Sequence, residues 1–476
     1  MSTLRTPSIP LAAAPRSADE RPKPRFPKRN EPAPDRKLTP SETLEASRGG
    51  LAFGMLVTFT LVLYARPGDL YRPLATAHLA ELAALGAIST YGLSLVFGQP
   101  RFYRSKELWI VAALTALFVI GVPFAFWRSG AMTVLTDLWL KTALIFFLLT
   151  QTTTTIHRLR ILLWSIILCM FVVSTYSALN PQMSYTFEGR LMGATTGFLS
   201  GNYLGVAVGS MLPFIALFFM KTRSWSIRLL LAVTVLLLMW QMILTASRSN
   251  LMQITLSMTL IWFLFLRQLR GARILAAVVV IAMTIFLASA PAVFWNRMQT
   301  LWTGEVEQNW QSQSAKFSEE QRENLFWRSI EYTIEDPLLG VGLGNFSIKS
   351  GNMTGRASEW LGTHNTYTQI SSEAGIPALL LYVALLYGSL RAMLRISRAT
   401  EKQPGFEDFF FFSRAMMVGL LVFAFAGFFA HLGYDYYFYY LVGIGTCLKG
   451  CYQRATEGPE DQRAKPPGVL LPRMAR

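Results

Sequence analysis

Long apolar runs separated by short polar segments fill most of the chain between residues 50 and 450. A helix needs roughly 20 mostly apolar residues to cross a bilayer. Inside the bilayer, backbone polar groups must bond within the protein, which favours helices in such runs. The pattern predicts an all-α polytopic membrane protein with about 12 transmembrane helices, at 50–66, 74–98, 107–127, 131–151, 160–179, 202–220, 227–246, 250–267, 274–293, 374–392, 410–430 and 434–450.

Two polar segments stand apart from these runs. Residues 1–49 are rich in Pro, Arg and Lys and too poor in apolar residues to fold, which predicts a disordered basic cytoplasmic tail. Residues 294–373 form an interval of about 80 residues, far longer than an ordinary connector. The predicted parts are therefore the tail, transmembrane helices 1–9 at 50–293, one large loop at 294–373, transmembrane helices 10–12 at 374–450, and a cytoplasmic tail at 451–476.

The second half of the large loop has its own pattern. Ser318 and Gln321 have the spacing of a capping box, which predicts that a helix begins there. Glycines follow at alternate positions, and glycine permits backbone conformations and close approaches that a Cβ forbids. A turn that wraps a ligand and a turn that simply packs closely both fit Gly340, Gly342 and Gly344.

Charge gives the orientation of the predicted helices. If the N-terminal tail is cytoplasmic, fifteen Lys and Arg residues lie in short cytoplasmic loops and five in short outer loops. Basic residues concentrate in cytoplasmic loops of membrane proteins. The bias places both chain ends in the cytoplasm, and it places the large loop, Arg190, Arg248, His431 and Asp435 at the outer face.

Composition narrows the class of protein. A content of 52% hydrophobic and 15% charged residues, with a mean hydropathy of +0.35, excludes a soluble domain. The net charge of +16 lies mostly in loops that face an anionic bilayer surface, so no nucleic-acid partner is expected. The three cysteines make no disulfide framework. The chain has no nucleotide-binding P-loop, zinc-ligand pattern or Asp-x-Asp pair, so neither a metal nor a cofactor is predicted.

Two arginines near the outer face are candidates for binding phosphate. Arg190 lies in a glycine-rich loop, and Arg248 follows the end of an apolar run. A guanidinium is permanently charged and binds phosphate oxygens with two hydrogen bonds. The pair suits a diphosphate head group at the lipid boundary. An exposed loop charge at Arg190 and a snorkelling side chain at Arg248 are the alternatives.

His364 and Asp435 are the other candidate site residues. Histidine titrates close to neutrality, so His364 suits the removal of a proton from an attacking hydroxyl, although an isolated loop histidine is also common as polar surface. The Asp435 carboxylate is suited to orient an imidazole, to pair with an arginine or to bind an acceptor hydroxyl. A solvated turn residue is the alternative. Asp137 and Lys141, four residues apart in one run, are predicted to pair, or to mark the path of a transporter.

Several segments together resemble one family. Arg328, DPLLGVGLGNF at 336–346, HNTYTQ at 364–369 and EAGIPALLLY at 373–382 resemble the core motif of the O-antigen ligase and polymerase superfamily. TASRSN and GRLMGATTGFLSGNYLG resemble its two upstream arginine segments. The resemblance implies a GT-C-like glycosyltransferase of the bacterial inner membrane. Such an enzyme takes a glycan from undecaprenyl diphosphate at the periplasmic face, without a metal, and passes it to lipid A core or to another glycan.

The resemblance also implies residue roles. His364 is expected to activate the acceptor, Arg190 and Arg248 to hold the diphosphate, and Arg328 to support the loop or the same head group. Supporting roles fall to Asn365, Asp435, Gly340, Gly342 and Gly344. The predicted function is an O-antigen ligase. The ten-residue spacing between Arg190 and Gly201 is similar to that of some polymerases, so a polymerase is the first alternative and a polysaccharide flippase the second.

Overall fold

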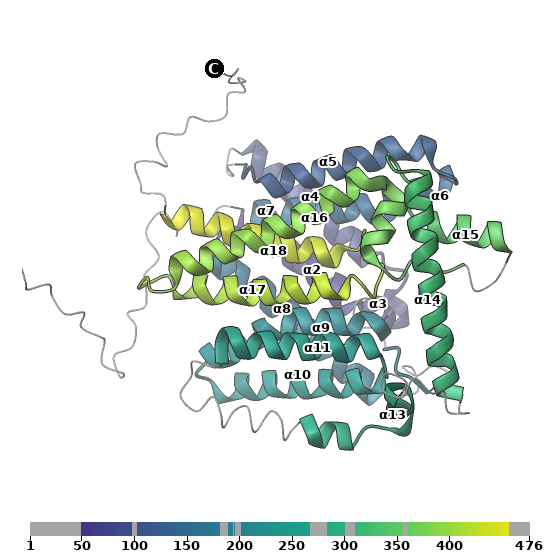
Figure 1. The fold of residues 1–476 in the computed structure, drawn as a ribbon. Helices are drawn as coiled ribbons and strands as arrows, with labels where there is room; N and C mark the ends of the chain where they lie inside the picture. Colours follow the sequence, from purple (N-terminus) through teal and green to yellow (C-terminus); the bar gives the residue numbers. More distant parts are fainter. Residues whose placement is uncertain are drawn as a thin grey trace, which may run out of the picture. The chain divides into compact units, whose positions relative to one another are not determined.

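The computed structural model describes residues 49–97, 102–180, 189–193, 195, 201–266, 283–299, 310–355 and 360–456. Within these residues the chain is helical and contains no β-strand. Helices lie over the predicted apolar runs, namely α2 (Gly50–Ala65), α4 (Leu79–Val96), α5 (Lys106–Gly121), α7 (Leu140–Thr152), α8 (Ile156–Leu179), α9 (Leu204–Lys221), α10 (Trp225–Leu244), α11 (Arg248–Ile261), α16 (Thr366–Thr400), α17 (Glu407–Ala426) and α18 (Tyr436–Thr456) (Figure 1).

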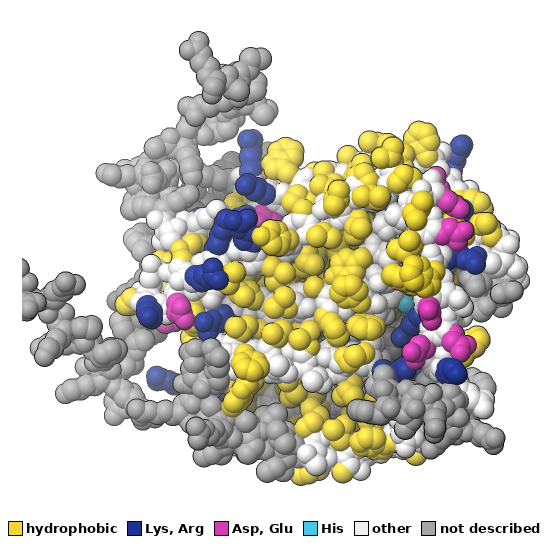
Figure 2. Space-filling view, in the orientation of Figure 1, with side chains coloured by type: hydrophobic (Ala, Val, Ile, Leu, Met, Phe, Trp, Pro, Cys, Tyr) yellow, Lys and Arg dark blue, Asp and Glu magenta, His cyan; other side chains and the backbone are white. Residues whose placement is uncertain are grey.

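Nine helices within the described ranges are long and apolar enough to cross a membrane, namely Leu79–Val96, Lys106–Phe124, Arg128–Thr152, Ile156–Leu179, Leu204–Lys221, Trp225–Leu244, Arg248–Leu266, Thr366–Thr400 and Glu407–Ala426. An apolar belt crosses the middle of these helices, and charged side chains gather at both ends (Figure 2). The prediction of an all-α polytopic membrane protein is confirmed. The count of twelve stays a prediction, because the run at 274–293 is described only from residue 283.

Small residues bring α9 and α11 into close contact. A Cβ on Gly205 would lie 2.5 Å from Asn250 Oδ1, so only glycine fits there. Ser257 Oγ donates to the Gly209 carbonyl at 2.7 Å, and Asn250 Nδ2 donates to the Gly201 carbonyl at 3.0 Å. Glycines and interhelical hydrogen bonds of this kind drive helix association in membranes. They fix the start of α11, and with it Arg248, against the start of α9.

The large loop holds α13 (Ala292–Gln299), α14 (Trp310–Glu335) and α15 (Phe346–Thr354). Figure 1 shows α14 running across the ends of the spanning helices. Leu325, Ser329 and Tyr332 are buried on its inner face, and Trp327 is exposed on the other. The predicted start of this helix at Ser318 is wrong, because the good helix formers Gln, Ala and Lys lie upstream of it and the helix begins at Trp310.

The predicted pairing of Asp137 with Lys141 is not observed in the described structure. Lys141 Nζ lies 4.0 Å from Glu81 Oε1, and Asp137 Oδ1 accepts a hydrogen bond from Thr136 at 3.3 Å. The segment Val134–Trp139 is a π-helix, whose wider turn removes the four-residue alignment of the two side chains. Asp137 is exposed on the outside of the bundle.

Candidate functional site

A break in α16 anchors the glycine turn of the large loop. Gly375 has φ 84° and ψ 170° inside α16, and Pro377 has no N–H to donate to the Glu373 carbonyl. The carbonyls of Ser372 and Glu373 accept instead from Val341 N at 2.8 Å and from Gly342 N at 3.0 Å. Backbone groups freed by a helix break in a membrane protein need hydrogen-bond partners. The carbonyls at the break and the N–H groups of the glycine turn are partners for each other.

The three predicted glycines are required for this close packing. All have positive φ angles, of 66°, 103° and 67°. A Cβ would lie 2.4 Å from the Glu373 carbonyl carbon at Gly340, 2.3 Å from Ala125 Cβ at Gly342, and 2.7 Å from Val134 Cγ2 at Gly344. Of the two interpretations left open by the sequence, the geometry favours close packing over a turn that wraps a ligand.

The same helix positions His364 at its outer end. Asn365 Oδ1 accepts from Tyr367 N at 2.9 Å and from Thr368 N at 3.2 Å, so Asn365 is the N-cap of α16. Thr363 Oγ1 donates to the Asn365 carbonyl at 2.8 Å. His364 between them has a φ of 50°, which is rare for a residue with a side chain. The capped end of α16 therefore holds the backbone of His364 in a strained conformation, with the imidazole half-buried.

A second turn brings His431 against His364. The turn between α17 and α18 is joined to Thr366, whose N donates to the Gly427 carbonyl at 2.7 Å and whose Oγ1 donates to the Ala430 carbonyl at 2.7 Å. Leu432 N donates to the same Oγ1 at 3.0 Å. These bonds flank His431, and its ring lies edge-on to that of His364 with 5.2 Å between centroids.

Both imidazoles are held in the neutral form. Burial, with smaller contributions from the neighbouring His431 and Arg322, lowers the pKa of His364 to about 3. Burial also lowers the pKa of His431. The expectation that His364 titrates close to neutrality is therefore wrong. Its imidazole is neutral across the physiological range and is available to accept a proton.

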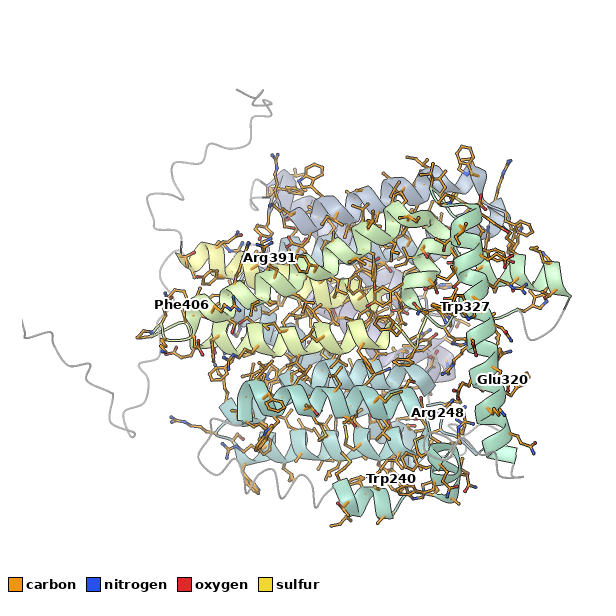
Figure 3. All side chains as sticks on the ribbon, viewed as in Figure 1. Trp240, Arg248, Glu320, Trp327, Arg391 and Phe406 are labelled. Atoms are coloured by element: carbon orange, nitrogen blue, oxygen red, sulfur yellow. The ribbon has the colours of Figure 1, made fainter. Side chains whose placement is uncertain are left out.

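Three arginines converge beside this pair. Arg248 Nη1 lies 2.9 Å from Glu319 Oε2 of α14, and Arg190 Nε donates to the Thr245 carbonyl at 3.0 Å just before α11 (Arg248 in Figure 3). Arg322 of α14 interacts with both: burial lowers its pKa first, and the positive charges of Arg248 and Arg190 lower it further. The like charges of Arg190, Arg248 and Arg322 act on one another here, and such a concentration of positive charge suits an anion.

Arg322 is not among the site residues predicted from the sequence, whereas Arg328 is. The two residues are six positions apart, so Arg328 lies about 9 Å further along α14. There it interacts with Tyr332, the buried tyrosine one turn on. A spacing signal for Arg322 exists, because Arg322, Leu325 and Ser329 recur at helical intervals on the face that packs against the bundle.

Asp435 lies at the start of α18 rather than beside His364. Its Oδ1 accepts from Tyr437 N at 3.1 Å, which caps the helix. It also interacts electrostatically with Arg66 and Tyr203. The structure thus brings Arg190, Arg248 and His364 together with the unpredicted Arg322, and it gives Asn365 and Asp435 capping positions. Within the described ranges, no group of three or more His, Cys, Asp or Glu side chains is placed to hold a metal ion.

The helices and this site define a polytopic all-α membrane protein with an arginine and histidine centre at one end of its helices. Residues 233–383 match the family model described as O-antigen ligase. The matched residues include Arg248, Arg322, the glycine turn and His364, and the match supports a relationship of this part of the chain to the O-antigen ligase and polymerase superfamily. No match to a curated protein was found. Arg190 and His431 lie outside the matched residues.

Proposed function

We propose that the protein is an O-antigen ligase-like glycosyltransferase that moves a glycan from undecaprenyl diphosphate to an acceptor hydroxyl at the periplasmic face of the bacterial inner membrane. The observation that carries the proposal is the convergence of Arg190, Arg248 and Arg322 beside the neutral imidazole of His364. The match to the O-antigen ligase model supports the family-level activity. The identity of the donor, the identity of the acceptor and the direction of attack are parts of the proposal.

The arginine cluster would bind the diphosphate of the donor. When the bond between the anomeric carbon and the diphosphate oxygen breaks, negative charge grows on the leaving group. Donors fixed in advance at that position stabilise the transition state more than the ground state. Arg248 and Arg322 are held on the separate helices α11 and α14, and the Arg248 side chain is only 13% exposed. The cluster is therefore preorganised for this charge.

His364 would accept the proton of the attacking hydroxyl. The acceptor oxygen forms a bond to the anomeric carbon, the proton moves to an imidazole nitrogen, and undecaprenyl diphosphate leaves from the opposite face, so the configuration inverts. A base works best when its pKa is near the working pH. A bound diphosphate would offset the charge of Arg322 and raise the pKa of His364 from its low value. Donor binding and base strength are thereby linked.

The acceptor separates the two members of this enzyme class. A ligase passes the glycan to lipid A core, and a polymerase passes it to another lipid-linked glycan. The matching family model supports the enzyme class as a whole. The spacing of Arg190 and Gly201 is similar to that of some polymerases, so the polymerase is kept as the alternative. The flippase alternative needs charges along an internal path, but Asp137, Lys141 and Glu81 are exposed on the outside of the bundle.

The test uses purified protein in liposomes with undecaprenyl-diphosphate glycan and either acceptor. The matched variant is His364→Asn, because asparagine tolerates a positive φ and is expected to preserve the backbone. His78→Asn, at an exposed histidine beside Glu81 that also has a positive φ, is the matched control. Product on lipid A core that disappears in His364→Asn supports the ligase, and longer lipid-linked chains support the polymerase. Full transfer by His364→Asn would refute the role of His364.

A further inference from the structure

His431 contacts the ring of His364, but the proposed transfer gives it no role. Its Nε2 lies 3.3 Å from Tyr203 Oη, within hydrogen-bond distance. Its Nδ1 is buried and has no hydrogen-bond partner within the described residues. A Cβ on Gly362 would lie 3.1 Å from the ring, so the backbone of the His364 loop covers the imidazole closely. A buried polar atom without a partner is unfavourable, and such atoms in natural proteins call for a functional explanation.

The surrounding bonds fix where this ring lies. Thr366 bonds the residues on both sides of His431, and the same threonine follows the N-cap that holds His364. Tyr203, just before α9, lies within hydrogen-bond distance of the His431 ring. Contacts therefore run in sequence from Tyr203 to His431 to His364. Three separate segments of the chain meet at this one pair of rings.

His364 needs such a neighbour. Its φ of 50° is a strained backbone conformation just before the start of α16. No hydrogen bond to its ring is present within the described ranges, so packing sets the ring's direction. The contact with His431 has an interplanar angle of 77°, the edge-to-face arrangement that rings prefer.

We propose that His431, anchored by Tyr203, is a positioning residue that sets the direction of the His364 imidazole toward the acceptor hydroxyl. The inference rests on the proposed function, because it assigns a role in the same transfer. His431 takes no proton from the substrate in this scheme. Its effect is transmitted through the His364 ring, and a displacement of about 1 Å at a reacting group costs up to about 100-fold in rate.

The test is a double-variant cycle of Tyr203→Phe and His431→Phe. Phenylalanine keeps a ring at each position and removes one partner of the 3.3 Å contact. Each single variant is expected to lower kcat by about 10- to 100-fold with the donor KM within about twofold. The double variant should be no slower than the slower single variant, because both remove the same contact. Thermal melting in detergent checks that each variant is folded.

The split between kcat and KM separates positioning from a general loss of packing. His431 is neutral because burial lowers its pKa, so His431→Phe removes its contact with the His364 ring without removing a charge. Loss of positioning should lower kcat and leave the donor KM and the melting temperature close to those of the wild type, whereas a general loss of packing should also raise the donor KM and lower the melting temperature. Additive effects of Tyr203→Phe and His431→Phe on kcat, or wild-type kcat in both variants, would overturn the positioning role of His431. If His364→Asn is inactive in the same assay, the proposed function still stands. An active His364→Asn overturns the proposed function instead.

Discussion

Single residues carry the electrostatics of the candidate site. Arg322 interacts with Arg190, Arg248 and His364, whereas Arg328 contacts Tyr332. Two arginines on one helix, six residues apart, therefore have different neighbours. One faces the positively charged cluster and the other supports the loop. This difference can be measured separately from catalysis.

Arg322→Ala should raise the donor KM by roughly 10- to 100-fold, because a hydrogen bond to a charged group contributes about 1.5–3 kcal/mol. The donor KM of Arg322→Lys should lie between those of the wild type and Arg322→Ala, because lysine keeps the positive charge but loses the planar pair of hydrogen-bond donors. Arg328→Ala is the matched comparison and should lower the melting temperature with little change in donor KM. Equal effects of Arg322→Ala and Arg328→Ala on the donor KM would contradict this assignment.

The histidine pair predicts a pH dependence of stability. The pKa of His364 falls from an ordinary 6.5 to about 3 on folding, so the unfolded chain binds more protons between these values. Stability should therefore fall as pH decreases from about 6.5 toward 3, by at most about 1.4 kcal/mol per pH unit for one histidine. Melting curves at pH 7.5 and pH 5 measure the effect. His364→Asn should reduce the slope, and an unchanged slope would argue against a buried neutral His364.

At the scale of elements, the site depends on the break in α16. The break frees two carbonyls for the glycine turn, and the turn holds α15 through Phe346 N, which donates to Glu373 Oε1 at 3.2 Å. The outer part of α16 then carries His364, and the inner part continues across the membrane. One helix thus supplies the anchor of the large loop and positions the proposed base at its outer end.

Gly375→Ala should be strongly destabilising, because the new Cβ would lie 2.3 Å from the Leu338 carbonyl oxygen in a residue with φ 84°. The predicted loss is about 2–4 kcal/mol from strain and the broken turn. Gly388→Ala in the same helix is the control, since nothing lies within 4 Å of its Cβ position. It should be neutral or stabilising by up to about 1 kcal/mol. Thermal melting of both variants in one detergent compares them, and similar melting temperatures would exclude the anchoring role.

At the scale of the whole molecule, the apolar runs were sufficient to predict the spanning helices, because a bilayer allows few other structures. The contacts between distant segments were not predictable. His431 was expected at the outer face, but its contact with His364 depends on the bonds of Thr366 to a turn more than 60 residues away. The contacts of Arg322 depend on which face of α14 packs against the bundle. The predicted pairing of Asp137 with Lys141 was wrong because the π-helix at Val134–Trp139 was not expected from the sequence.

The orientation in the membrane makes a separate prediction. Glu320 and Arg391 lie at opposite ends of the helices (Figure 3). The native cysteines Cys169, Cys447 and Cys451 are buried, so background labelling should be low. A membrane-impermeant maleimide added to intact spheroplasts should label Glu320→Cys and should label Arg391→Cys only after permeabilisation. The reverse pattern would place the candidate site in the cytoplasm and contradict the proposed use of a periplasmic donor.

The most direct measurement compares donor binding and transfer in a single variant. In liposomes loaded with undecaprenyl-diphosphate glycan, His364→Asn should bind the donor with the Kd of the wild type, because the arginine cluster is intact. Single-turnover transfer to the acceptor should fall by about 10²- to 10⁴-fold, the range expected for loss of a general base. Transfer at the wild-type rate with donor bound would contradict the assignment of this centre as the site of glycan transfer.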